Sequence, residues 1–154
     1  MLKNILLVLV VLFIGAQFIR PERNLGQPEG PNFIGIKHPL SPEVHALLER
    51  ACYNCHSNKT DYPWYANVQP VAWWLASHVK DGKRHYNLSE FGTYNAKREA
   101  EKLKETAGEV REGGMPLPSY TWMHPEARLT DAERKLIIDW AEGERGKLPA
   151  PAKP

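Results

Sequence analysis

The stretch Cys52-Tyr53-Asn54-Cys55-His56 decides how this chain is expected to fold, because it holds both of the chain's cysteines. Two thiols three positions apart, followed at once by an imidazole, form the C-x-x-C-H pattern through which a porphyrin is covalently attached. The histidine after the second cysteine is then placed to coordinate the iron from one side. The pattern therefore predicts one haem c, with Cys52, Cys55 and His56 as the residues that hold it.

Other chemistries use paired cysteines, and the rest of the sequence offers them little. A redox-active C-x-x-C is expected beside a βαβ pattern, and no segment of this chain alternates convincingly as a strand. A structural zinc site needs four ligands, so the two cysteines would have to recruit His56 and another histidine at unusual spacing. A disulfide that closes so short a ring contributes little and leaves His56 without a role. Haem is therefore the favoured interpretation, and thiol redox chemistry and zinc binding are the alternatives.

The second axial ligand of the iron is sought among the methionines and the other histidines. Met115 follows two glycines and precedes Pro116-Leu117-Pro118, a rigid loop that presents its side chain away from any helix face. A methionine ligand raises the reduction potential of haem, and Met115 is the predicted sixth ligand. His78 is the main alternative, although a lone histidine on an apolar helix face is more often a hydrogen-bonded core residue. His85, Met123, His124 and an open sixth position are the remaining possibilities.

The N-terminal segment predicts a passage across a membrane. Residues 4–19 carry no charge, and most of residues 5–14 are Leu, Val, Ile and Phe. This length suits a short spanning helix or the apolar region of a signal peptide. Arg20 and Arg23 follow at once, as at a membrane edge. Residues 1–20 are thus expected to be a transmembrane anchor, or a signal segment, that fixes the chain in the cell inner membrane with a single pass and its soluble domain in the periplasm.

The remainder of the chain predicts an all-α fold of short helices. Residues 21–40 are rich in proline and glycine and read as a linker. Residues 41–146 are expected to form the haem-binding domain, and residues 147–154 a flexible tail. Helical periodicity and capping residues predict four helices in that domain, over 42–51, 70–82, 95–112 and 131–142. The expected architecture is a cytochrome-c-like bundle around one haem, preceded by a membrane helix.

Composition limits the partners and the packing. A net charge of +2 with interspersed signs gives no basic stripe, so nucleic-acid binding is not expected. Aromatic side chains are numerous, and most of them are expected in the core or against the porphyrin, among them Trp64, Tyr65, Trp73, Trp74, Tyr120 and Trp122.

Longer stretches of the chain resemble the small c-type haem-binding domain family. The resemblance rests on Cys52 to Asn58, Tyr62-Pro63-Trp64-Tyr65, Pro70-Val71 with Trp73, His78-Val79, Gly82, Arg84, Asn87 to Phe91, Gly114-Met115-Pro116, Tyr120 and His124 to Thr130. It covers about residues 40 to 143, which is nearly all of the soluble part. It implies a cytochrome-c-like helical domain with Cys52, Cys55 and His56 at the haem. Phe91 departs from the pattern, which has a tryptophan there.

The predicted function is electron transfer by a membrane-anchored monohaem c-type cytochrome outside the cytoplasm. Its expected partner is a redox protein, for which a component of a respiratory chain is the natural candidate. The alternative is a haem-based sensor or ligand-binding module with a labile sixth position. No paired catalytic groups are recognisable, so neither peroxidase nor other enzymatic activity is expected.

Overall fold

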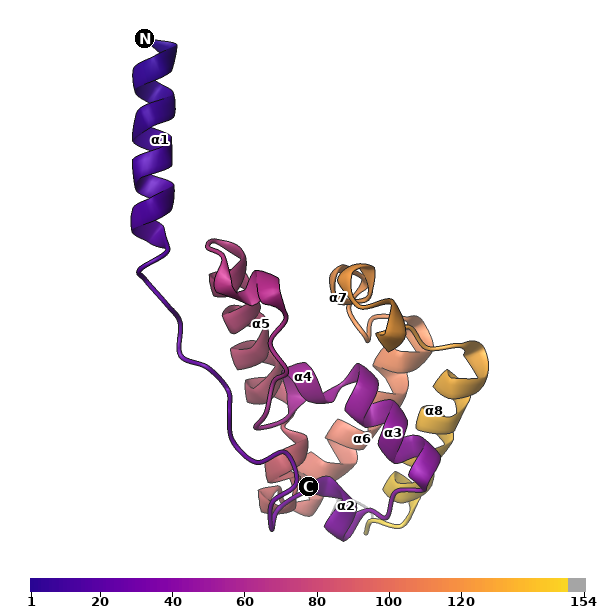
Figure 1. The fold of residues 1–154 in the computed structure, drawn as a ribbon. Coiled ribbons are helices and arrows are strands. Elements are labelled where there is room, and N and C mark those ends of the chain that lie inside the picture. The colour runs from indigo at the N-terminus through magenta and orange to yellow at the C-terminus, as the bar shows by residue number, and fades with distance from the viewer. Residues whose placement is uncertain (150–154) are drawn as a thin grey trace.

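The computed structural model describes residues 1–149 as a series of helices joined by loops (Figure 1). The described residues form no β-strand, and their isolated bridge pairs Leu25 with Lys59. The all-α prediction is confirmed. The tail predicted over 147–154 lies outside the described residues from position 150 onward. The elements in chain order are α1 (Leu2–Ala16), α2 (Ile34–Lys37), α3 (Pro42–Ala51), α4 (Tyr53–His56), η1 (Trp64–Asn67), α5 (Val71–His85), η2 (Leu88–Thr93), α6 (Ala96–Glu112), α7 (Pro118–Met123), η3 (Pro125–Ala127) and α8 (Asp131–Gly146).

Three of the long domain helices, α3, α6 and α8, begin at side-chain caps, and the caps Ser41 and Thr130 were predicted. The Ser41 hydroxyl accepts a hydrogen bond from the Val44 amide at the start of α3, and Asn95 caps α6 in the same manner. Thr130 and Glu133 form a reciprocal capping box at the start of α8. The Thr130 amide, together with the Arg50 guanidinium, lowers the pKa of Glu133 to about 2. Because Arg50 belongs to α3, this cap also joins α8 to α3 (Arg50 Nη2 to Glu133 Oε1, 2.7 Å).

Helix α5 continues one turn beyond its predicted end at Gly82. The Tyr86 amide donates to the Gly82 carbonyl at 2.9 Å, so the helical ladder passes through the glycine and reaches His85. Glycine usually ends a helix through a left-handed conformation, and Gly113 does so after α6 with φ of 76°. Gly82 therefore does not end α5.

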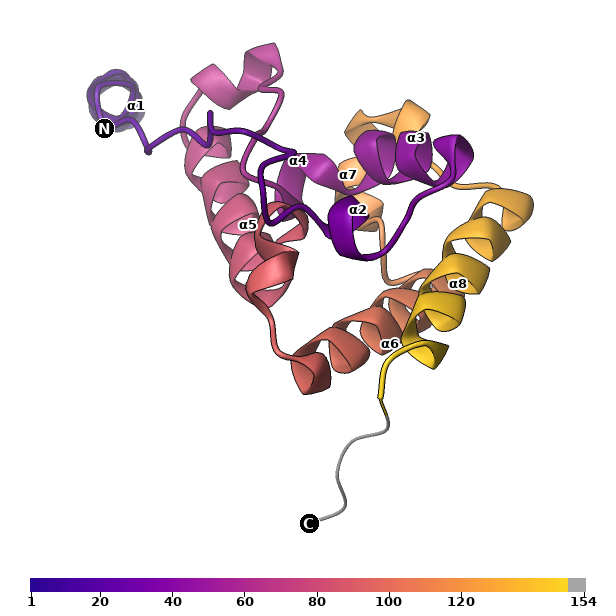
Figure 2. The ribbon, with the colours of Figure 1, turned by 90° about the horizontal axis from the view of Figure 1, so that it is seen from below.

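The hydrophobic core lies among α2, α3, η2, α6 and α8. Helices α6 and α8 pack most extensively on each other, and α3 packs on α8. Seen from below, α5, α6 and α8 form three sides of a ring, and α2, α3 and α4 close the fourth side (Figure 2). The core is filled by aliphatic side chains and three aromatic ones, including Leu48, Leu88, Phe91, Leu103 and Ile137. This arrangement holds α4, the short helix that carries the C-x-x-C-H motif, between α3 and α5.

The second half of the segment 21–40 is part of the core, which corrects its interpretation as a linker. Residues 34–37 form α2, and Phe33, Ile34 and His38 are buried. Proline and glycine indicated an extended path here, but the apolar residues between them are too few to show a helical period. Packing against η2 is what orders them.

A buried ionic cluster holds α2 against α6 and α8. The imidazole of His38 lies between two buried carboxylates, with Nδ1 3.2 Å from Glu144 and Nε2 3.7 Å from Glu99. Lys37 also pairs with Glu99, and Lys147 pairs with Glu144 at 2.6 Å. No local sequence pattern indicates this cluster, because its members come from three segments far apart in the chain.

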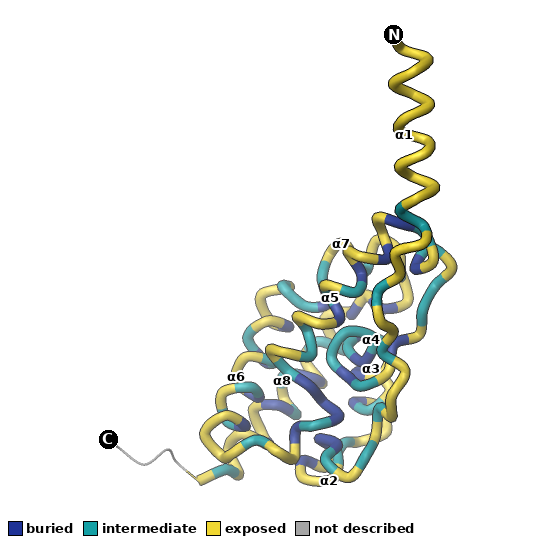
Figure 3. Tube along the Cα trace, turned by 90° about the vertical axis from the view of Figure 1, so that its left-hand side faces the viewer, coloured by how far each residue is buried: buried dark blue, intermediate teal, exposed yellow. Residues whose placement is uncertain are grey.

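Helix α1 projects from the rest of the molecule and is exposed over nearly its whole length (Figures 1 and 3). It covers 15 residues, which is shorter than the membrane helix predicted over residues 1–20. Among residues 1–149, no helix combines the length and the apolar character that crossing a membrane requires.

Candidate functional site

The C-x-x-C-H motif sits at the junction of α3 and α4. The Cys52 amide donates to the Leu48 carbonyl at 2.8 Å, which completes α3, and the Cys52 carbonyl accepts from the His56 amide at 2.9 Å, which closes the turn of α4. Both thiols and the imidazole therefore belong to a single helical turn. This turn fixes the spacing that the motif implied.

The two thiols are free and unactivated. Cys52 and Cys55 form no disulfide and are partly buried. Burial raises the pKa of Cys52 to about 12, to which the negative charge of Cys55 contributes, and burial raises the pKa of Cys55 to about 11. A catalytic thiol needs a lowered pKa to form its thiolate, so these values are unfavourable for thiol redox catalysis.

The His56 imidazole is held by two backbone carbonyls of α5 and the residue after it. Nδ1 lies 2.9 Å from the Tyr86 oxygen and 3.1 Å from the Gly82 oxygen, and because carbonyls only accept, Nδ1 carries the hydrogen. Burial lowers the pKa of His56, and the positive charge of His85 acts in the same direction. The ring is therefore neutral at pH 7, with its lone pair on Nε2, which forms no hydrogen bond within residues 1–149. This is the tautomer and the second-sphere support of a metal-bound histidine.

Gly82 allows α5 to approach this motif closely. A Cβ atom at position 82 would lie 2.6 Å from the carbonyl oxygen of Cys55, far inside van der Waals contact. Any side chain there would push α5 away from α4 and lengthen the hydrogen bonds to His56. A glycine is therefore needed in the middle of α5, because the backbone of the helix must lie this close to the carbonyl of Cys55.

The two residues between the cysteines have structural roles that sequence reasoning missed. Tyr53 is buried in the core. The side chain of Asn54 forms hydrogen bonds to two other segments. Its amide nitrogen donates to the Tyr120 hydroxyl at 2.8 Å, and its oxygen accepts from the Asp61 backbone amide at 2.8 Å. Asn54 therefore joins the motif to α7. Neither contact has a local sequence signal.

A polar network fixes the segment that follows the motif. The Asn58 amide group donates to Glu90 at 2.7 Å, and the Asn58 backbone amide donates to the Ser89 hydroxyl at 2.9 Å. Asn87 caps η2 by accepting from the Ser89 amide at 3.0 Å. These contacts hold η2 against the motif.

The structure places the candidates for the sixth ligand in different settings. Met115 lies half-buried in the loop between α6 and α7, where its amide donates to the Glu109 carbonyl at 3.2 Å. His78 Nδ1 bonds to the Trp74 carbonyl at 2.9 Å and its ring packs on the indole of Trp74. Both nitrogens of His124 are already engaged, one by Tyr65 and the other by Glu126. Met115 stays the predicted ligand.

The expectation that most of the aromatic residues are core is wrong for four tryptophans, Trp64, Trp73, Trp74 and Trp122. Trp64 and Trp122 are 76% and 77% exposed, and Trp73 and Trp74 are also exposed. The core is filled by aliphatic residues of longer helices. The tryptophans instead belong to the short elements η1 and α7 and to the outer face of α5, which the core does not cover.

The donor set of the motif fits a covalently attached haem better than the alternatives. Two free thiols stand on the same turn as an imidazole whose Nε2 is unengaged. Within residues 1–149, no group of three or more His, Cys, Asp or Glu side chains is gathered closely enough to hold a metal ion by itself. A zinc site therefore lacks its ligands, whereas a haem brings four nitrogen ligands for its own iron.

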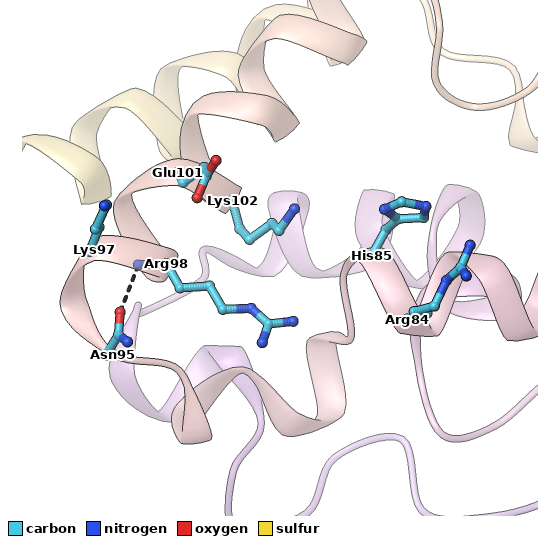
Figure 4. Close-up of a pocket in the computed structure, with 7 residues that line it drawn as sticks. All are labelled: Arg84, His85, Asn95, Lys97, Arg98, Glu101 and Lys102. Atoms are coloured by element: carbon cyan, nitrogen blue, oxygen red, sulfur yellow. Dashed lines mark hydrogen bonds between the residues drawn. The ribbon is translucent and has the colours of Figure 1, made fainter.

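A cationic pocket of about 340 Å³ lies near the motif, between the end of α5 and the start of α6. Lys97 and Arg98 form no ion pair with any described carboxylate, and the Arg98 guanidinium is held 4.0 Å above the ring of Tyr94. Arg84 and Lys102 are each paired with a neighbouring acid. Figure 4 shows the side chains that line the pocket, which are Arg84, His85, Asn95, Lys97, Arg98, Glu101 and Lys102.

Comparison with protein families gives one assignment for most of the chain. Residues 11–143 match a family model described as a haem-binding domain. No curated protein and no solved structure matches the chain. The match includes the motif, the loop of Met115 and all the helices from α2 to α7.

Proposed function

The chain belongs to the haem-binding domain family, and from this premise we propose that it is a monohaem c-type cytochrome that carries electrons. Cys52 and Cys55 would form the two thioether bonds, and His56 would be the proximal ligand. When bound, the haem iron supplies a one-electron couple between its ferric and ferrous states. The role of the chain is to orient that iron, to shield it from water and to set its potential.

The observation that carries this proposal is the state of His56. Nδ1 donates to two carbonyl oxygens, those of Gly82 and Tyr86, and this leaves the lone pair of Nε2 free to bind a metal. Hydrogen bonds of this kind fix the tautomer and raise the basicity of a ligating histidine. Because their pKa values are raised, the thiols remain protonated and weakly nucleophilic until haem is attached.

A pyridine haemochrome spectrum of the denatured full chain, produced with a haem-attachment system, tests the proposal. We expect one haem per chain that stays with the polypeptide after acid extraction, because thioether bonds survive denaturation. A colourless denatured chain, with thiols that react with a thiol reagent, would refute it.

We further propose Met115 as the second axial ligand. Its loop follows α6 and is held to that helix by the bond to Glu109. Axial ligands set haem potentials over about 0.8 V, and loss of a thioether ligand lowers the potential. We expect Met115→Leu to lower the midpoint potential by on the order of 0.1 V and to allow carbon monoxide to bind the reduced protein rapidly.

Potentiometric titration and carbon monoxide mixing measure these two effects, and Met123→Leu is the matched control. Met123 is a partly exposed methionine at the end of α7, a few residues further along the chain. An unchanged potential and spectrum in Met115→Leu would remove Met115 from the iron. His78→Ala would then be the next variant to measure. Rapid carbon monoxide binding by the unaltered protein would instead favour the sensor function.

The cationic pocket supports an acidic redox partner. Unpaired Lys97 and Arg98 attract an anionic surface and speed its association, and the effect weakens as salt screens it. We expect Lys97→Gln/Arg98→Gln to slow oxidation by the anionic reagent ferricyanide severalfold at low salt and little at high salt. Stopped-flow rates measure this. Lys104→Gln, an exposed charge on the same helix outside the pocket, is the control, and equal rates in all three proteins would exclude a docking role.

Residues 1–20 support attachment to a membrane. Helix α1 contains no charged residue after Lys3, and all of its large apolar side chains are exposed. Its 15 residues extend about 22 Å, less than the roughly 30 Å of a bilayer core, and the uncharged segment continues to Ile19. We propose that this segment holds the protein at the inner membrane with the haem domain in the periplasm, where haem is attached to C-x-x-C-H motifs.

A further inference from the structure

Exposed apolar side chains gather at one end of the molecule. This end, called the apolar end below, consists of α1, η1, the start of α5 and α7, which lie on the same side in two views (Figures 1 and 3). Elsewhere in residues 1–149, the large exposed apolar residues are single ones, namely Leu25, Ile36 and Leu136. The apolar end includes Trp64, Val71, Trp73, Trp74, Trp122 and Met123. Scattered apolar residues are ordinary on a protein surface, but a gathered set of this kind marks an interaction site.

Direct hydrogen bonds fix the end of α1 to the start of α5. The Gln69 amide donates to the Gln17 side chain at 2.9 Å, and the Gln69 side chain donates to the Ile19 carbonyl at 2.9 Å. The indole of Trp73 donates to that same carbonyl at 2.8 Å. Trp73 therefore sits where the uncharged segment ends and Arg20 begins. Tryptophan takes this position at membrane interfaces, because its ring is apolar and its N–H needs a polar partner.

We propose that the apolar end lies against a lipid bilayer, with α1 in the lipid and the exposed tryptophans of η1, α5 and α7 in the headgroup region. This inference rests on the proposed membrane attachment and adds that the haem domain itself touches the membrane in one orientation. Charges of both signs adjoin α7, since Arg128 donates to the Thr121 carbonyl and Glu126 pairs with His124. The apolar side chains and not the charges therefore hold the proposed contact. Lipid is the chosen occupant because the exposed surface continues directly into α1.

The proposed orientation leaves the cationic pocket in water. Helix α5 starts at the apolar end and runs away from α1, so that its last turn, with Arg84 and His85, lies at the opposite end (Figure 1). A partner would then approach the pocket without competition from the membrane.

Spin-label accessibility on the full holoprotein in phosphatidylcholine vesicles tests this orientation. Ser119→Cys places a nitroxide on α7, and Thr93→Cys places one at the end of η2 near the pocket. In the holoprotein, the thioether-bound Cys52 and Cys55 do not react with the label. We expect collisions with a water-soluble nickel chelate to be on the order of tenfold fewer at position 119 than at 93, and collisions with oxygen to be more frequent.

A second variant separates the tryptophans from α1. In Trp64→Gln/Trp122→Gln, we expect the chain to float with the vesicles as before, while the nickel collisions at position 119 rise toward those at position 93. Trp140→Phe is the control, since that indole is half-buried and bonds to the Pro39 carbonyl. Two results would overturn the inference. The first is protein that floats with the vesicles but whose label at position 119 collides with nickel as often as the label at position 93, and the second is an unchanged collision rate at position 119 after the double substitution. Protein that does not float, or that takes up label without an introduced cysteine, would instead refute the proposed attachment or the haem bonds.

Discussion

Replacing both Cys52 and Cys55 with serine is expected to abolish covalent haem completely. The serine hydroxyl keeps the size of the side chain but forms no thioether, so any haem that His56 still binds is released on denaturation. The measurement is haem staining of a denaturing gel, together with the absorbance of the acid-extracted chain. We expect no haem on the double variant and one haem on the unaltered protein.

The single variants show whether each sulfur is bonded. Cys52→Ser and Cys55→Ser should each retain stain at a reduced yield, because one thioether still holds the porphyrin. Stain on the denatured double variant would mean that haem is bonded elsewhere, and it would contradict the assignment of the motif.

The largest effect on stability is expected at His38. Its imidazole separates the carboxylates of Glu99 and Glu144, and Glu99 is fully buried, with 0% of its surface exposed. His38→Leu places an apolar side chain between the two buried acids, each of which keeps only its lysine partner, Lys37 for Glu99 and Lys147 for Glu144. Removing a hydrogen-bonding partner from a buried polar group costs about 1–3 kcal/mol, and more for a charged group, so we expect the free energy of unfolding to fall by at least about that amount. Urea unfolding followed by circular dichroism measures it.

His45→Leu is the matched control for this prediction. His45 also pairs with a glutamate, Glu29, at 2.6 Å, but both of these side chains are more than a third exposed. An exposed pair contributes about 1 kcal/mol or less. Equal losses in the two variants would show that the buried cluster does not stabilise the fold beyond its packing.

Features with a local signature were predictable from the sequence. The caps of α3, α6 and α8 depend on residues within one turn of each helix start, and the structure has them at Ser41, Asn95 and Thr130. The spacing of the C-x-x-C-H motif is likewise local, since one helical turn contains it. Such patterns require no knowledge of the rest of the fold.

Features that depend on distant contacts were not predictable. The carbonyls of Gly82 and Tyr86 reach His56 from about thirty positions away, and any residue type supplies the same carbonyl oxygen. The burial of α2 depends on packing against η2, and the contacts of His38 come from Glu99 of α6 and Glu144 of α8. The exposed tryptophans were wrongly expected in the core, because the hydrophobicity of a residue does not show whether other elements of the fold cover it.

The last turn of α5 lies between the imidazole of His56 and the cationic pocket. Its inward carbonyl at Gly82 holds the imidazole of His56, while Arg84 and His85 of the same turn border the cationic pocket. Under the proposed function, a partner docked there would neutralise charge close to the imidazole of His56 and restrict the backbone that orients it. We therefore expect complex formation to shift the driving force for electron transfer, so that the free and the docked carrier are different reductants.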